Sequence, residues 1–222
     1  MDERVGDELL TWLRGSGMQI ALAVFCLGIV FRIGQNLFAG RAKNFSVPRG
    51  GQFGPGLRTI WHRSFPEPDM SRRNYFTHVA GYTFHIGLFI TLLFLGEHIL
   101  LFKHLLGFGW PALPRVFIDI AALLSIAALV AMLAHRLMDP VLQKISDYQD
   151  YLVWFLTIAP LATGFLVLHP MGMSYQTSLI WHLITIELLL IAIPFTKLSH
   201  ILSIFISRWY NGAITGYKGV RS

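Results

Sequence analysis

The stretch that decides the fold is HLITIELLLIAIPFTKLSH, residues 182–200, an apolar segment with a histidine at each end. The two histidines are 18 positions apart. This is about five whole turns of an α-helix, so His182 and His200 are expected to project from the same face. At about 1.5 Å per residue they would lie roughly 27 Å apart, close to the thickness of the hydrocarbon core of a bilayer. The spacing therefore predicts a membrane helix with one imidazole near each membrane surface.

The composition of the whole chain favours a membrane protein. Of its 222 residues, 54% are hydrophobic and 14% are charged, whereas soluble domains carry about 25% charged residues. The single cysteine, Cys26, can form no internal disulfide, and the sequence has no C-x-x-C-H motif for covalent haem attachment. A zinc or iron–sulfur site made by this chain alone is not expected, because the necessary thiolates are missing.

Five segments are long and apolar enough to cross a bilayer. They are residues 18–38, 76–102, 116–135, 151–168 and 178–207. Backbone groups in lipid must find hydrogen-bond partners within their own segment, so we expect helices. The sequence predicts an all-α membrane protein, a five-helix transmembrane bundle that forms a single domain over residues 1–222. Residues before the first span lack a basic n-region and a cleavage site, so we expect this span to be retained.

The distribution of Lys and Arg predicts the orientation of the bundle. The long loop of residues 39–75, the loop between the third and fourth spans and the C-terminal tail together carry 12 Lys and Arg, and the opposite side carries 4. The positive-inside rule therefore places the N-terminus outside and the C-terminus in the cytoplasm. Residues 39–75 would form a cytoplasmic loop that contacts lipid or docks a cytoplasmic partner. The positive charge thus indicates topology, and we expect no nucleic-acid binding.

Histidines are the residues of this sequence most suited to chemistry. There are nine, and ionisable groups inside membrane spans are functional candidates by default. On antiparallel second and fifth helices, His85 would lie opposite His200, and His98 opposite His182. A haem b between two helices takes one neutral imidazole from each side. Because both axial positions of the iron are then filled, the expected role is electron transfer.

The second span fits this arrangement less simply. His85 and His98 are 13 positions apart, which places them about 140° apart around an ideal helix. Gly87 and Gly96 would permit a local distortion or a close approach of the porphyrin. His78, seven positions before His85, is the alternative inner ligand, although it is only about 10 Å away along the helix axis.

Four short segments carry a resemblance to a known family. They are FHIG at residues 84–87, GEH at 96–98, HRLMDP at 135–140 and PFTKLSH at 194–200. With them, the chain resembles the cytochrome b (gamma) subunit of respiratory nitrate reductases and related quinone-linked membrane anchors. The resemblance implies two haems b, one held by His85 and His200 near the cytoplasm and one by His98 and His182 near the outer face. It also implies a quinone or menaquinone site beside the outer haem.

The resemblance further implies the cytoplasmic membrane of a bacterium or archaeon, with an iron–sulfur subunit and a catalytic subunit as partners. The spacing of the second-span ligands and the length of the first cytoplasmic loop exceed those of the nitrate reductase members. Nitrate is therefore not implied as the terminal substrate, and a heterodisulfide-reductase-like or sulfur-compound partner fits as well.

Other polar residues have candidate supporting roles. Arg136 could hold a propionate of the inner haem, and Arg115 a propionate or a quinone carbonyl at the outer haem. The alternative for both is interfacial anchoring. Glu187 is expected to face the interior of the bundle, where it would pair or relay protons. His169 could bond a quinone, although an ordinary loop histidine is the favoured interpretation.

The function expected from these observations is that of a dihaem cytochrome b membrane-anchor subunit of a respiratory oxidoreductase. It would pass electrons between the quinone pool and iron–sulfur clusters of a cytoplasmic partner. No residues for the terminal reaction are expected in this chain, so that catalytic site would lie on another subunit. The alternatives are a proton- or ion-translocating protein with a His/Glu relay and a non-redox membrane anchor.

Overall fold

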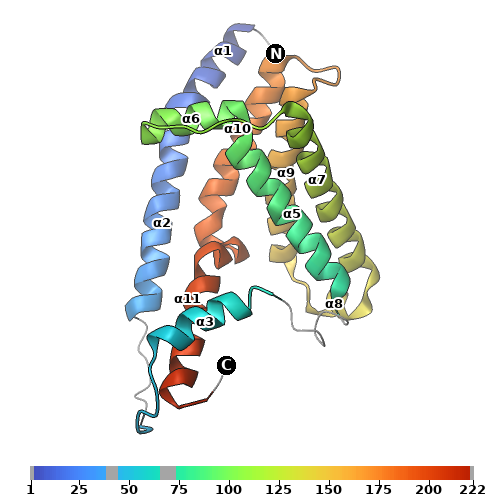
Figure 1. Ribbon diagram of the computed structural model, residues 1–222. Coiled ribbons are helices and arrows are strands. Elements are labelled where there is room, and N and C mark those ends of the chain that lie inside the picture. The colour runs from blue at the N-terminus through green and yellow to red at the C-terminus, as the bar shows by residue number, and fades with distance from the viewer. Residues whose placement is uncertain (1–2, 39–44, 66–73, 221–222) are drawn as a thin grey trace. The chain divides into compact units, whose positions relative to one another are not determined.

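The computed structural model describes residues 3–38, 45–65 and 74–220 (Figure 1). All regular structure in these ranges is helical. Five stretches are long and apolar enough to cross a membrane: Arg4–Phe38, Tyr75–Phe94, Arg115–Met138, Tyr148–Leu168 and Tyr175–Phe195. The prediction of an all-α protein with five candidate spans is therefore confirmed, and the direction of the termini stays a prediction.

The described chain forms two compact units, each treated by itself below. The first unit comprises residues 1–22 and 76–191. Its elements are α1 (Glu3–Trp12), a π-helical segment (Leu13–Gly17), the start of α2 (Met18–Phe38), α5 (Tyr75–Phe94), α6 (Gly96–Leu106), α7 (Arg115–Met138), α8 (Pro140–Ile145), α9 (Tyr148–Leu168) and α10 (Tyr175–Ala192). The single-domain organisation expected from the sequence stays a prediction.

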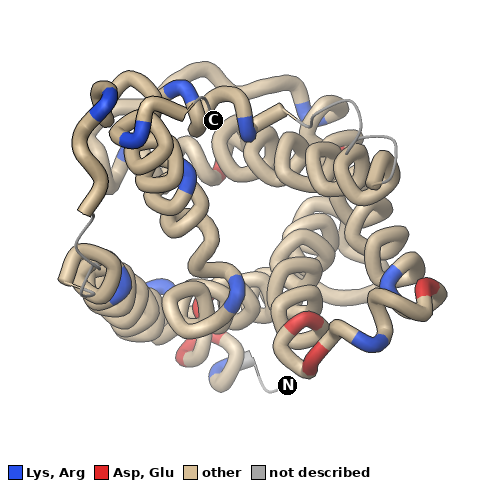
Figure 2. Tube along the Cα trace, turned by 90° about the horizontal axis from the view of Figure 1, so that it is seen from below, with Lys and Arg blue, Asp and Glu red and all other residues tan. Residues whose placement is uncertain are grey.

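The second unit comprises residues 23–75 and 192–222. It contains the rest of α2, α3 (Phe53–His62), two 3₁₀ turns (Ile193–Phe195 and Lys197–Ser199) and α11 (His200–Tyr217). Its described residues include seven Lys and Arg and no Asp or Glu. Figure 2 marks the Lys and Arg residues along the chain in blue and the Asp and Glu residues in red. The basic residues are Arg32, Arg49, Arg58, Arg63, Lys197, Arg208 and Lys218. Every Lys, Arg, Asp or Glu that the structure describes in this unit is therefore a cation.

The prediction of one helix over residues 76–102 is wrong. Helix α5 ends at Phe94, Leu95 is extended with φ −73° and ψ 131°, and α6 begins at Gly96. Figure 1 shows α6 turned steeply away from α5. The last carbonyls of α5 find partners outside the helix, because the Trp110 indole donates to the Leu93 carbonyl at 2.6 Å and the Leu113 amide to that of Phe94 at 3.1 Å. The helix can therefore end here without leaving these carbonyls unpaired.

The prediction of one helix over residues 178–207 is also wrong. Helix α10 ends at Ala192, two 3₁₀ turns follow, and α11 begins at His200. Pro194 lacks an amide hydrogen and so cannot continue the α-helical bonding. Thr196 is fully extended, at φ −120° and ψ −177°, and its hydroxyl accepts from the Leu198 amide at 3.3 Å. The inference that His182 and His200 share one helix face requires a continuous helix and is wrong as well.

The other spans differ from prediction mainly in their ends. The first, expected at residues 18–38, belongs to a longer helical stretch from Arg4 to Phe38. The third, expected at 116–135, runs Arg115–Met138, and the fourth, expected at 151–168, runs Tyr148–Leu168. The fourth begins earlier because Asp147 and Asp150 form a reciprocal capping box. The predicted loop of residues 39–75 contains α3.

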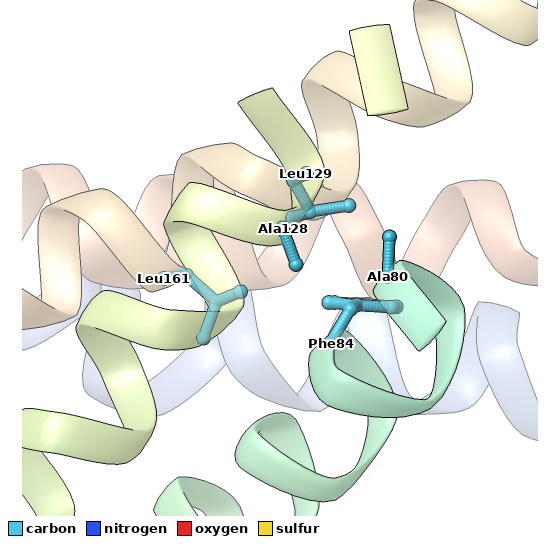
Figure 3. Close-up of a cluster of buried hydrophobic side chains, with 5 residues drawn as sticks. All are labelled: Ala80, Phe84, Ala128, Leu129 and Leu161. Atoms are coloured by element: carbon cyan, nitrogen blue, oxygen red, sulfur yellow. The ribbon is translucent and has the colours of Figure 1, made fainter. Parts of the chain in front are cut away.

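The core of the first unit lies where α5, α7 and α9 meet. Ala80, Phe84, Ala128, Leu129 and Leu161 form a buried apolar cluster (Figure 3). Close to it, a Cβ on Gly87 would collide with the Ser125 hydroxyl and would lie 2.6 Å from the Ala121 carbonyl oxygen. The small residues thus allow α5 and α7 to approach closely. This packing positions α5, the helix that carries His85.

Candidate functional site

The structure brings together one of the two predicted histidine pairs. His98, near the start of α6, faces His182 of α10 within the first unit. Their ring centroids are 6.3 Å apart, and the ring planes are only 15° from parallel. Both side chains are partly buried. The break at Leu95 makes this possible, because His98 no longer has to follow the helical register of α5.

Hydrogen bonding defines the tautomer of His98. Its Nδ1 lies 3.1 Å from the backbone oxygen of Thr91, in the last turn of α5. A carbonyl oxygen can only accept, so Nδ1 carries the proton. In the neutral ring the lone pair is therefore on Nε2. Metal-binding histidines are oriented in this way, with the second ring nitrogen donating to a carbonyl or carboxylate.

His182 is held against α9. A Cβ on Gly164 would lie 2.9 Å from the Cε1 of His182, so only glycine lets the imidazole pack this closely on the helix. The Nδ1 of His182 lies 3.3 Å from the hydroxyl oxygen of Thr163, and this hydroxyl also lies 2.7 Å from the Ala159 carbonyl oxygen. Since the hydroxyl proton goes to the carbonyl, the oxygen accepts from Nδ1, which again leaves the lone pair on Nε2.

The second predicted pair, His85 and His200, is divided between the two units. His85 lies on α5, where its Nδ1 donates to the Gly81 carbonyl at 2.7 Å, and His200 is the first residue of α11, where its Nδ1 donates to the Lys197 carbonyl at 2.9 Å. Both rings thus have the same tautomer as His98 and His182. Their pairing with one another stays a prediction, as does the alternative role of His78 on α5.

The two arginines predicted to contact propionates or a quinone already have partners. Arg115 lies 3.7 Å from the Asp119 carboxylate and donates to the Leu168 carbonyl at 3.0 Å. The same carboxylate lies 3.0 Å from the Nε2 of His169. Arg136 donates to the Ser146 hydroxyl at 2.7 Å, and its Nη1 lies 3.6 Å from Asp150. These contacts join the ends of α7 to α9 and to the loop before it, so each arginine has a structural role in the first unit.

Glu187 is buried, as expected, with 8% of its surface exposed. Its carboxylate faces the π-helical segment, where a Cβ on Gly17 would lie 2.9 Å from Oε1 and 3.0 Å from Oε2. Within the described chain, Oε1 has no hydrogen-bond partner. The expected ionic pairing of Glu187 is therefore not present among the described residues.

Sequence reasoning missed Arg32, which lies in α2 six positions before its end. Its Nε donates to the Pro194 carbonyl at 2.7 Å. The sequence did contain a signal for it, because an arginine inside an apolar span is costly and marks a candidate functional site by default.

Among the described residues no group of three or more His, Cys, Asp and Glu is arranged to hold a metal ion. A haem needs only two protein ligands, because the porphyrin supplies the others.

Comparisons with known proteins identify a relative but no activity. No family model matches the chain, and no solved structure matches it. A protein of Nitratidesulfovibrio vulgaris (strain Hildenborough), described only as "Protein", is 39% identical over 148 residues, which are 67% of this chain and 65% of the relative. The chain thus spans less than two thirds of that relative's length. The relative's description names no activity, ligand or partner.

Proposed function

We propose that the chain is a dihaem cytochrome b membrane-anchor subunit of a respiratory oxidoreductase complex. In this proposal it passes electrons between the quinone pool and iron–sulfur clusters of a cytoplasmic partner. The observation that carries the proposal is the His98–His182 pair, two nearly parallel imidazoles from two helices of one unit. The proposal places the chain in a bacterial or archaeal cytoplasmic membrane, with the N-terminus outside.

The centroid separation of the pair is compatible with both rings holding one iron. Each imidazole would contribute a metal–nitrogen bond of about 2 Å and the distance from that nitrogen to the centre of its ring. The sum of these distances for two rings is about the observed separation of the centroids. Each ring has its Nδ1 hydrogen-bonded and its lone pair on Nε2, the arrangement in which a histidine binds a metal. A haem b held by both residues would supply one-electron redox chemistry.

The remaining parts of the proposal rest on the sequence and on the shared tautomer. His85 and His200 would hold a second haem b, with His78 as the alternative to His85. The seven basic residues and absent carboxylates of the described second unit support a cytoplasmic location for it, because cationic segments are retained on that side. A quinone or menaquinone would react at the outer haem, and the terminal reaction would take place on a partner subunit.

A reduced-minus-oxidised spectrum with haem quantification tests the proposal. The purified wild-type protein should contain two haems b per chain, and His98→Ala and His182→Ala should each lose about half of them, since each variant removes an axial ligand of one iron. His104→Ala is the matched control, because His104 is an exposed residue of the same helix as His98. It should keep the full haem content.

The same spectrum separates the alternatives. A ring pair at 6.3 Å is also compatible with a simple aromatic contact. A proton-translocating protein or a non-redox anchor would be colourless whether or not its histidines were changed. A colourless wild-type protein, or full haem content in both the His98→Ala and His182→Ala variants, would contradict the proposed function.

A further inference from the structure

Arg32 is a cation with no anionic partner among the described residues of its own unit. It lies inside the candidate span Arg4–Phe38, where an unpaired charge is costly. The ion pairs between described residues include those of Arg115, Arg136 and His169, and Arg32 takes part in none of these. The described residues of the second unit contain no Asp or Glu at all. The compensating charge for Arg32 therefore has to come from another molecule or from outside these residues.

The guanidinium of Arg32 is held in a defined position by two hydrogen bonds, and its other N–H groups can donate to a further acceptor. Its Nε donates to the Pro194 carbonyl at 2.7 Å, and its Nη1 donates to the Gln35 amide oxygen at 3.2 Å. The anchoring carbonyl is itself fixed, because Pro194 packs against α2 so closely that a Cβ on Gly28 would lie 2.5 Å from its Cβ. A guanidinium has five N–H groups, so three remain for a further acceptor.

A cavity of about 210 Å³ opens beside Arg32, between α2 and α11. Its polar lining includes Arg32, Ser199 and Ser203, and its apolar lining includes Ile33, Leu202 and Ile206. No carboxylate lines it. The volume is below the roughly 300–1,000 Å³ of pockets that enclose a whole small molecule. It therefore suits one polar group of a ligand whose remainder lies in the bilayer.

We propose that this cavity, hereafter the Arg32 cavity, binds the phosphate of an anionic phospholipid. Arg32 would donate to the phosphate oxygens and neutralise their charge, with the hydroxyls of Ser199 and Ser203 as further donors. The aliphatic side chains would contact the start of an acyl chain. Basic pockets between membrane helices bind anionic head groups in this way. A quinone fits less well, because a neutral ligand leaves the charge of Arg32 uncompensated.

The test uses the full-length protein, purified in detergent and reconstituted into phosphatidylglycerol or phosphatidylcholine nanodiscs. After re-extraction, retained phospholipid is counted by native mass spectrometry. The wild-type protein should retain about one phosphatidylglycerol per chain, and Arg32→Gln should bind it roughly tenfold more weakly through loss of the charged hydrogen bonds. Arg58→Gln is the matched control, because Arg58 is an exposed arginine of the same unit outside the cavity. It should bind phosphatidylglycerol like wild type.

A second variant and a second ligand keep the test decisive. If Arg32→Gln fails to fold, the Ser199→Ala/Ser203→Ala double variant, which keeps the charge, should still bind phosphatidylglycerol several-fold more weakly. Equal retention of phosphatidylglycerol and phosphatidylcholine by wild type would overturn the proposal. So would unchanged retention in both variants, or full thermal stabilisation by inorganic phosphate with no phospholipid retained.

Haem content is measured on the same samples. If Arg32→Gln loses haem but keeps its phospholipid, Arg32 contacts a propionate and the lipid assignment is wrong. The proposal does not rest on the haem ligands, since a colourless protein that retains phosphatidylglycerol through Arg32 would refute the proposed function alone.

Discussion

Thr163 and the carbonyl of Thr91 decide which nitrogen of each paired imidazole carries the proton and which keeps its lone pair. Both place the proton of the ring on Nδ1, and both belong to elements other than the helix of the histidine that they contact. The sequence alone predicted that His98 and His182 lie together, but not what orients their rings. These contacts depend on how α5 meets α6 and how α9 meets α10, and neither junction has a local sequence signal.

Replacing Thr163 by Val tests this orienting role. The variant keeps the shape of the side chain and removes the acceptor for His182 Nδ1, so the affinity for one haem should fall by about tenfold or more, as is typical for partners of metal ligands. Titration of the haem-free protein with haem measures this. Thr157→Val is the control, because Thr157 lies on the same helix and its hydroxyl donates to the Val153 carbonyl. Equal haem affinities for the two variants would refute the orienting role.

Asp139 is a residue whose effect depends on pH. It lies one position beyond the third span, and its carboxylate caps α8 by accepting from the backbone amides of Leu142 and Val141. These amides hold the pKa of Asp139 below its ordinary value of 3.8. Because the folded state favours the charged carboxylate, the stability that it adds is present above that value and is lost as pH falls through the folded-state pKa.

We therefore expect Asp139→Ala to unfold at a lower temperature than wild type near neutral pH. The difference should shrink as the pH is lowered from about 6 to about 3, because the wild-type carboxyl becomes protonated. Asp139→Asn, which retains a capping oxygen that does not titrate, is the comparison. Thermal unfolding followed by circular dichroism across this pH range is the measurement, and a pH-independent difference would contradict the role given to the carboxylate.

At the scale of elements, the two helix breaks differ in how visible they are in the sequence. The break in the fifth span had a signal in Pro194, which cannot continue α-helical bonding. The break at Leu95 was harder to predict, because the groups that satisfy the last carbonyls of α5, Trp110 and Leu113, come from the chain that returns after α6. Apolar composition predicts that a span exists, whereas its ends depend on such distant partners.

The contact between α5 and α7 yields a further test. A methyl group at Gly87 would collide with the Ser125 hydroxyl, so Gly87→Ala should lower the free energy of unfolding by about 1–3 kcal/mol through overpacking. Gly81→Ala on the same helix is the control, because, apart from the adjoining residues and backbone of α5 itself, no atom lies within 4 Å of a Cβ there. That variant should be neutral or slightly stabilised, since alanine favours a helix. Chemical denaturation in detergent measures both, and equal losses of stability would contradict the close approach.

At the scale of the whole molecule, the acidic residues that the structure describes are distributed unevenly between the two units. All the Asp and Glu residues that the structure describes belong to the first unit, where Asp119 and Asp150 are paired with cations. The sequence predicted the sidedness of the charge from loop composition. It could not predict the division into units, because that depends on which helices pack together and not on the hydrophobicity of any one span.

The interruption at residues 193–199 affects how the chain can vary in length. In an unbroken helix, one inserted residue rotates everything beyond it by about 100°, which would turn the imidazole at 182 relative to the one at 200. Here the α-helical hydrogen bonding lapses between Ala192 and His200. An insertion or deletion at residues 193–199 would change the 3₁₀ turns and leave the hydrogen bonding of α10 intact. Helix α10 would then keep its orientation while α11 rotates about its own axis. Insertions and deletions among related sequences should therefore be more frequent at residues 193–199 than in the adjoining helical turns of α10 and α11.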